Sequence, residues 1–119
     1  MTHFDLIFLQ FPEEIQGIIP GLTQCKGDHC TVLIDNSQSE EIQRKTLRHE
    51  LSHIRLGHFD EDRTESDQAY LRNIQSIEAE ADLYADQMSE EELSYLMTFC
   101  DRRKDLSGHF DSELSFIPA

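Results

Sequence analysis

Apolar residues recur near the N-terminus at a spacing that suits helical packing. They are Phe4, Ile7, Phe8, Phe11, Ile15, Ile18 and Ile19. Pro12 must begin or break a segment there, and Pro20-Gly21 marks a turn. The next run, Thr31 to Ile34, is rich in β-branched and aliphatic residues and predicts a strand. Lys26-Gly27-Asp28 predicts a hairpin turn between Thr23–Cys25 and the segment from Cys30 to Asp35.

The pattern then changes to helical spacing. Ser39 is a candidate N-cap for a helix from about Glu40 to Leu56, which Gly57 would end. A second helix is expected over about Leu71 to Met88. Ser89 and Glu92 resemble a capping box that begins a third helix, with Leu93, Leu96, Met97 and Phe99 on it. Between the first two helices, residues 58–69 with their acidic stretch 60–67 predict a mobile loop.

Length and composition predict one small domain over residues 1–119, with a core from about 3 to 102 and a loosely ordered tail over 103–119. Asp and Glu number 24 against 10 Lys and Arg, a formal charge of -14, which disfavours direct nucleic-acid binding. No secretory signal or membrane-spanning run is apparent. We therefore expect a cytoplasmic protein in which Cys25, Cys30 and Cys100 are reduced thiols.

The expected first helix carries His49-Glu50-Leu51-Ser52-His53. Residues four apart share a helical face, so His49 and His53 can bind one metal ion through their ring nitrogens. Glu50 is offset by about 100° from His49 and can act beside the ion as a general base. Leu47, Leu51 and Ile54 should face the core, and a polar stripe of Arg44, Arg48, Ser52 and Arg55 should face solvent.

A catalytic zinc needs a third protein ligand. The expected second helix offers Glu78 and Asp82, which share a face, while Ala81 and Ala85 allow close packing on the first helix. We predict that Glu78 is the third ligand and that Asp82 accepts a hydrogen bond from a ligand histidine. Glu80 points away from Asp82 on the helical count and is the weaker candidate.

Other residues are weaker candidates than this set. His58 does not fit the extended spacing that would make it the third ligand, although it can line the cleft. Tyr84 is a second cleft candidate, and His58, Tyr70 and Tyr84 are the candidates for stabilising an oxyanion. Cys25, His29 and Cys30 also suggest a metal site, but they have no matching second pair and are better explained as hairpin residues.

These motifs resemble the ImmA/IrrE family of metallo-endopeptidases found in bacteria and their mobile elements. The resemblance rests on the segment 31–35, on the segment 44–53 and on Ile77-Glu78-Ala79-Glu80-Ala81-Asp82-Leu83-Tyr84-Ala85. It implies an α+β, zincin-like domain in which helices carrying HExxH and ExxxD pack on a small β-sheet. It also implies His49, His53 and Glu78 as ligands and Glu50 as the catalytic base. Tyr84 replaces the usual Phe, and the segment 86–89 is more polar than in the family.

The resemblance implies hydrolysis of a peptide bond in a protein substrate, specifically a helix-turn-helix repressor. The charge and the hydropathy of the chain predict no direct contact to nucleic acid or membrane. The expected cofactor is Zn²⁺, and Mn²⁺ also suits histidine and carboxylate ligands. A rival hypothesis is a binding module that controls a repressor or toxin by contact alone. Glu50 favours the enzyme, because a purely binding protein has no use for the base.

Overall fold

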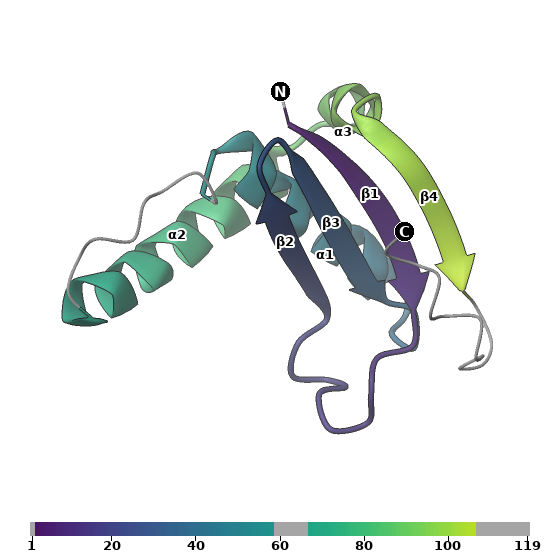
Figure 1. The fold of residues 1–119 in the computed structure, drawn as a ribbon, viewed down its shortest axis with the longest axis horizontal. Coiled ribbons are helices and arrows are strands. Elements are labelled where there is room, and N and C mark those ends of the chain that lie inside the picture. The colour runs from purple at the N-terminus through teal and green to yellow at the C-terminus, as the bar shows by residue number, and fades with distance from the viewer. Residues whose placement is uncertain (1, 59–66, 107–119) are drawn as a thin grey trace.

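The computed structural model describes residues 2–58 and 67–106, with backbone alone over 67–73. Within these ranges the chain forms four strands and three helices (Figure 1). In chain order they are β1 (His3–Leu9), β2 (Gly21–Lys26), β3 (His29–Asp35), α1 (Glu40–Arg55), α2 (Asp67–Gln87), α3 (Glu90–Met97) and β4 (Cys100–Leu106). This is a small α+β domain, as the coarser part of the fold prediction stated.

The strands form one mixed sheet in the order β2-β3-β1-β4. Strand β1 is central and pairs in parallel with β3 on one side and β4 on the other, while β2 and β3 form an antiparallel hairpin. Helix α1 lies behind the sheet in Figure 1, and α2 crosses α1 on that side. The opposite face of the sheet carries none of the described helices.

The core forms between α1 and the covered face of the sheet. Alternate residues of β1 and β3 point toward the helix, as strand geometry requires. The buried cluster consists of Phe4, Leu6, Phe8, Cys30, Val32, Ile34, Leu51, Ile54, Met88 and Leu96. Each side chain of this size contributes about 1.5–3 kcal/mol through burial. The cluster fixes α1, and with it the metal motif, against the sheet.

Residues 3–9 form a strand, so the helical interpretation of this segment is wrong. Phe4, Leu6 and Phe8 alternate toward the core, while Ile7 on the other face is also buried. Burial on both faces of the central strand removes the clean period of two and gives a run that resembles a helical face.

The hairpin prediction is confirmed, with Gly27 in the left-handed region at φ 62°. The prediction of three reduced thiols is wrong, because Cys25 and Cys30 form a disulfide. The two residues face each other directly across the hairpin, with their Cα atoms 3.9 Å apart. Cys100 is free, and burial raises the pKa of its thiol.

The boundaries of α1 agree with the prediction. The Ser39 hydroxyl accepts the backbone N–H of Ile42 at 3.2 Å, and Gly57 follows the helix with φ 73°. Ser89 caps α3 in the same way, accepting the N–H of Glu92 at 3.0 Å. Helix α2 begins at Asp67, earlier than expected, so residues 67–69 are not part of a loop. Of the rest of the predicted loop, His58 is described and residues 59–66 lie outside the described part of the chain.

The predicted loose tail is wrong for Arg103 to Leu106, which belong to β4. The sequence does not indicate this strand, because it is charged at Arg102, Arg103, Lys104 and Asp105. Charged residues are tolerated in β4 because it is an edge strand. Residues 107–119 lie outside the described part of the chain. No helix within the described residues is long and apolar enough to cross a bilayer.

Candidate metal centre

The C-terminal half of α1 carries the first part of the candidate site. Glu50 and His53 are only 8% and 6% exposed, whereas His49 is partly accessible. Leu51 is fully buried on the core side. Ser52 is also fully buried and donates to the backbone oxygen of Arg48 at 2.7 Å, so its assignment to the solvent-facing stripe is wrong. The end of α1 is therefore covered on more sides than an ordinary amphipathic helix.

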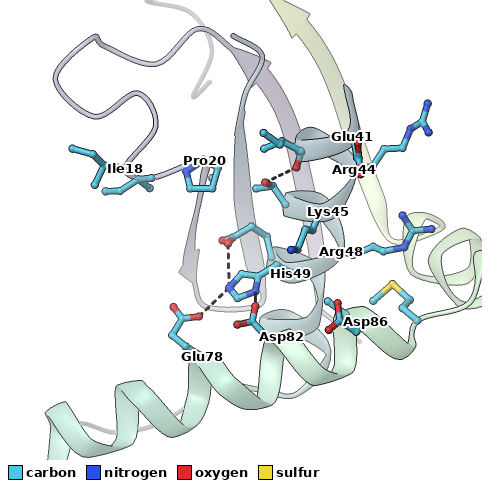
Figure 2. Close-up of a pocket in the computed structure, with 17 residues that line it drawn as sticks. Ile18, Pro20, Glu41, Arg44, Lys45, Arg48, His49, Glu78, Asp82 and Asp86 are labelled. Carbon is cyan, nitrogen blue, oxygen red and sulfur yellow. Dashed lines mark hydrogen bonds and ion pairs between the residues drawn. The ribbon is translucent and has the colours of Figure 1, made fainter. Parts of the chain in front are cut away.

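Helix α2 supplies the second part. Ala81 and Ala85 are buried, and their small side chains allow α2 to approach α1. Glu78 and Asp82, one turn apart on α2, both reach His49 (Figure 2). The side chains of Glu78 and Asp82 are 51% and 68% exposed, in contrast to the buried groups of α1.

Three ligand-type atoms converge at the junction of α1 and α2. The Nε2 atoms of His49 and His53 lie 3.1 Å apart. Glu78 Oε2 lies 2.9 Å from each of them. The predicted set of His49, His53 and Glu78 is therefore assembled by the fold, from residues 25 and 29 positions apart in the chain.

The outer nitrogens of both histidines have their own partners. His49 Nδ1 lies 2.8 Å from Asp82 Oδ1, which is the contact predicted for Asp82. His53 Nδ1 lies 2.9 Å from His58 Nδ1, and His58 Nε2 lies 2.5 Å from Glu80 Oε1. These three outer contacts can all be hydrogen bonds when His49, His53 and His58 each carry one ring proton. Each ligand histidine then donates from Nδ1, and His58 donates from Nε2 to Glu80.

This proton assignment leaves the two inward Nε2 atoms with lone pairs. Burial lowers the pKa of His53, which favours its neutral form, although the Glu78 carboxylate acts in the opposite direction. Two imidazole lone pairs and a carboxylate oxygen then lie about 3 Å apart with no proton between them. In this tautomer, a cation bound among the three atoms would relieve their mutual repulsion. The separations are close to the roughly 3.3 Å expected between ligands of a tetrahedral zinc with bonds of about 2.0–2.1 Å. The three residues therefore fit a zinc ion.

Glu50 lies beside this triad. Its Oε2 is 4.0 Å from His49 Nε2, and its Oε1 accepts a hydrogen bond from Thr23 Oγ1 at 2.6 Å. Glu50 also has an oxygen within 4.8 Å of donor atoms of both histidines, so it is a second candidate for the third ligand. The closer approach of Glu78 to both Nε2 atoms favours Glu78 as ligand and leaves Glu50 free for another role.

Strand β2 holds Glu50 in place. Thr23 is buried and lies on the strand next to α1. At Gly21 a Cβ atom would come within 2.4 Å of Thr46 Cγ2 and 3.4 Å of Glu50 Cγ, so only glycine allows β2 this close to the helix. Neither Thr23 nor Gly21 was identified from the sequence, because nothing local marks a contact that spans 27 residues.

A groove of about 920 Å³ is lined by two members of the triad, His49 and Glu78, and by Glu50. In Figure 2 it lies between the segment with Ile18 and Pro20, the exposed side of α1, and α2 with Glu78, Asp82 and Asp86. Ile18, Ile19 and Ile42 expose apolar surface along it. His49, Glu50 and Glu78 line the groove where α1 meets α2, so a chain segment bound in the groove would meet the candidate site.

Comparison of the chain with protein-family models, with curated proteins and with solved structures finds no match. The residues and their geometry therefore carry the functional argument.

The remaining candidates have different positions. His58 supports His53 from behind and does not line the groove. Tyr84 does not line it either, since its hydroxyl donates to Glu92 on α3. Burial, followed by this contact with Glu92, raises the pKa of Tyr84. The side chain of Tyr70 lies outside the described residues. Glu80, the weaker ligand candidate, contacts His58. The explanation of Cys25, His29 and Cys30 as hairpin residues agrees with the Cys25–Cys30 disulfide.

Proposed function

We propose that this protein is a zinc-dependent endopeptidase whose site consists of His49, His53, Glu78 and Glu50. The observation that carries the proposal is the convergence of two imidazole nitrogens and one carboxylate oxygen at separations of 2.9–3.1 Å. A second carboxylate beside this triad, lining an open groove, is the arrangement that metal-assisted hydrolysis requires. A closed structural zinc site would need a fourth protein ligand in place of the open position.

Each residue has a defined role in this proposal. A zinc ion held by the triad supplies Lewis-acid activation of the substrate carbonyl and of water. Glu50 accepts the proton of the attacking water and returns it to the leaving amine. Thr23 orients the Glu50 carboxylate by its 2.6 Å hydrogen bond. Asp82 and the His58–Glu80 pair keep the ligand histidines in the required tautomer.

The groove supports a polypeptide substrate. Its length along α1 and its apolar residues Ile18, Ile19 and Ile42 suit an extended chain segment with an apolar side chain. From the resemblance to the ImmA/IrrE family, we infer that the substrate is a helix-turn-helix repressor, in the cytoplasm, and that cleavage releases the genes it represses. The formal charge of -14 supports contact with the repressor and not with its DNA.

The rival function is control of a repressor or toxin by binding alone. The groove suits this function equally, so the two must be separated by chemistry. Glu50 is the discriminating residue, since a binding module has no need for a buried carboxylate held beside the triad. Zn²⁺ is the proposed ion, and Mn²⁺ is the alternative that the donor set allows.

The proposal is tested by a cleavage assay. The purified protein, stripped of metal and reloaded with Zn²⁺ or Mn²⁺, is mixed with the helix-turn-helix regulator encoded beside its gene. We expect cleavage by the wild type and a loss of about 100- to 10,000-fold in Glu50→Gln, the usual contribution of a general base. Glu91→Gln on exposed α3 is the matched control and should cleave normally. Tight binding without cleavage would favour the rival function. The absence of both cleavage and binding would refute the choice of substrate.

A further inference from the structure

A second group of histidines and aspartates lies on the sheet, outside the site described above. It consists of His3 and Asp5 on β1, His29 on β3 and Asp101 on β4. His29 Nε2 is 3.2 Å from Asp5 Oδ2, and His29 Nδ1 is 3.6 Å from Asp101 Oδ2. His3 Nδ1 is 2.9 Å from the other oxygen of Asp101. Asp5, His29 and Asp101 each offer one ligand atom within 4.8 Å of those of the other two.

These residues lie on the face of the sheet opposite α1. His3 and Asp5 alternate with Phe4 and Leu6, which are fully buried in the core that α1 covers. Because side chains alternate between the faces of a strand, His3 and Asp5 point the other way. His29 is paired with His3 in the β1–β3 register and shares its face. The cluster is therefore separated from the triad of α1 and α2 by the sheet itself.

The fourth residue of the cluster, Asp101, lies at a β-bulge. Phe4 pairs with Cys100, but the next residue, Asp5, pairs with Arg102, so Asp101 is an extra residue in β4. In the bulged strand the Asp101 carboxylate lies beside both His3 and His29. Bulges frequently direct a side chain to a functional site in this way.

Asp5 is incompletely satisfied by these contacts. Its Oδ1 atom is buried and has no hydrogen-bond partner among the described residues. Burying a carboxylate oxygen without a partner is costly. Asp5 and Asp101 are also like charges on either side of one imidazole. A divalent cation would bind both carboxylates and could engage the second oxygen of Asp5.

We propose that Asp5, His29 and Asp101 form a second divalent-metal site, with His3 supporting Asp101 from outside. Two carboxylates and one imidazole form a donor set that suits Zn²⁺ or Mn²⁺. The formal charge of -14 favours accumulation of cations around the chain as a whole. The site does not depend on peptidase activity, because it shares no residue with the triad.

The test is the zinc stoichiometry of the protein, measured by native mass spectrometry and by calorimetric titration after removal of metal with a chelator. We expect two zinc ions per chain in the wild type and one in Asp101→Asn. Asp105→Asn, an exposed substitution on the same strand, is the matched control and should keep two. His49→Ala should lose the other ion and keep the one held by Asp101, which distinguishes the two sites.

A second readout locates the ion. Mn²⁺ added to the His49→Ala protein should broaden the ring resonances of His29 and His3 by paramagnetic relaxation, and Asp101→Asn should raise the Mn²⁺ concentration needed by about tenfold or more. The proposal is wrong if Asp101→Asn binds as many zinc ions as the wild type, or if the His29 and His3 signals stay sharp. Either result would mean that the cluster consists of His–Asp ion pairs only.

Discussion

Helices α1 and α2 contribute to the same candidate site, but the protein holds them in different ways. The groups on α1 are set by the core: Glu50 and His53 are buried, Leu51 packs under them, and Thr23 on the sheet fixes Glu50. The groups on α2 are presented from an exposed surface, with Glu78 and Asp82 more than half accessible. Ala81 and Ala85 provide the buried apolar contacts next to them.

This difference between the two helices indicates that the α1 part of the site is fixed by the fold, whereas the α2 part is held more weakly. The two histidines and the base lie on α1, which the core holds against the sheet. The α2 carboxylates reach the same point through polar contacts, which contribute less than apolar burial and weaken in salt. A cation bound by both helices would stabilise the α2 side most, and the exposed α2 side also leaves the groove open to a substrate.

The largest expected effect is the loss of zinc affinity when a ligand is removed, and it can be compared with the loss of folding stability in the same variants. His53→Ala and Glu78→Ala should each weaken zinc binding by about 100-fold or more, since even residues that only orient ligands contribute 10–100-fold. The two variants should differ without metal. His53 is buried, so its removal should lower the free energy of unfolding by about 1–3 kcal/mol, whereas removal of exposed Glu78 should change it little. Calorimetric zinc titration and urea unfolding measure the two effects. Equal losses of stability would contradict the contrast between the helices.

Metal binding should act unevenly on the two helices. At a free Zn²⁺ concentration of 100 times Kd, the folded state gains about 2.7 kcal/mol. Amide hydrogen exchange should show the larger gain in protection in α2 and the smaller one in α1. Addition of a chelator should reverse it. Asp101→Asn removes the proposed second site and serves as the control, because it should leave the response of α2 unchanged. Equal protection of both helices would show that α1 also depends on the ion.

The contact of β2 with α1 can be altered without touching a ligand. Gly21→Ala places a Cβ 2.4 Å from Thr46 Cγ2, so the strand or the helix must shift. We expect a loss of about 1–3 kcal/mol by urea unfolding, together with lower activity, because Glu50 moves with the contact. Thr46→Ser removes the opposing methyl group, and the double variant should recover much of the loss. If the double variant does not regain stability, the strain does not come from the contact with the Thr46 methyl group.

The smallest expected effect concerns the segment that leads into α1. Asp35 is fully buried; burial alone would raise the pKa of its carboxyl, but hydrogen bonds from Ser37, Phe11 and Gln38 outweigh it and lower the pKa. The stabilisation is therefore present above the unfolded pKa near 4 and is lost as the pH falls through the folded value. Urea unfolding at pH 7 and pH 3, with chelator present, should show that the wild type loses about 1–2 kcal/mol more than Asp35→Asn.

Much of the candidate site could be predicted because its signals are local. One helix and its two caps contain Ser39, the His-Glu-x-x-His spacing and Gly57. The helical period and the capping preferences are therefore enough to place them. Glu78 and Asp82 follow from the same rule on α2. Contacts between distant segments had no such signal. Thr23 on Glu50, the Cys25–Cys30 bridge and the burial of Ser52 depend on how β2, β3 and α2 pack around α1.

The two strands that were not predicted failed for opposite reasons. Strand β1 is central and apolar on both faces, so its alternation disappears. Strand β4 lies at the edge and is almost entirely charged, so its sequence resembles a tail. Each becomes recognisable only from its neighbour in the sheet, which is information about pairing and not about local propensity.

The pairing of β1 with β4 has a consequence during protein synthesis. Strand β1 precedes the three described helices in the chain and β4 follows them, so β1 leaves the ribosome before β4, yet the two lie side by side at the centre and edge of the sheet. While the chain is being made, the hairpin and α1 can dock on β1, but its other edge stays open until Cys100 to Leu106 emerge. The nascent protein thus exposes an unpaired edge of its most apolar strand, and completion of the sheet is the late, non-local step of folding.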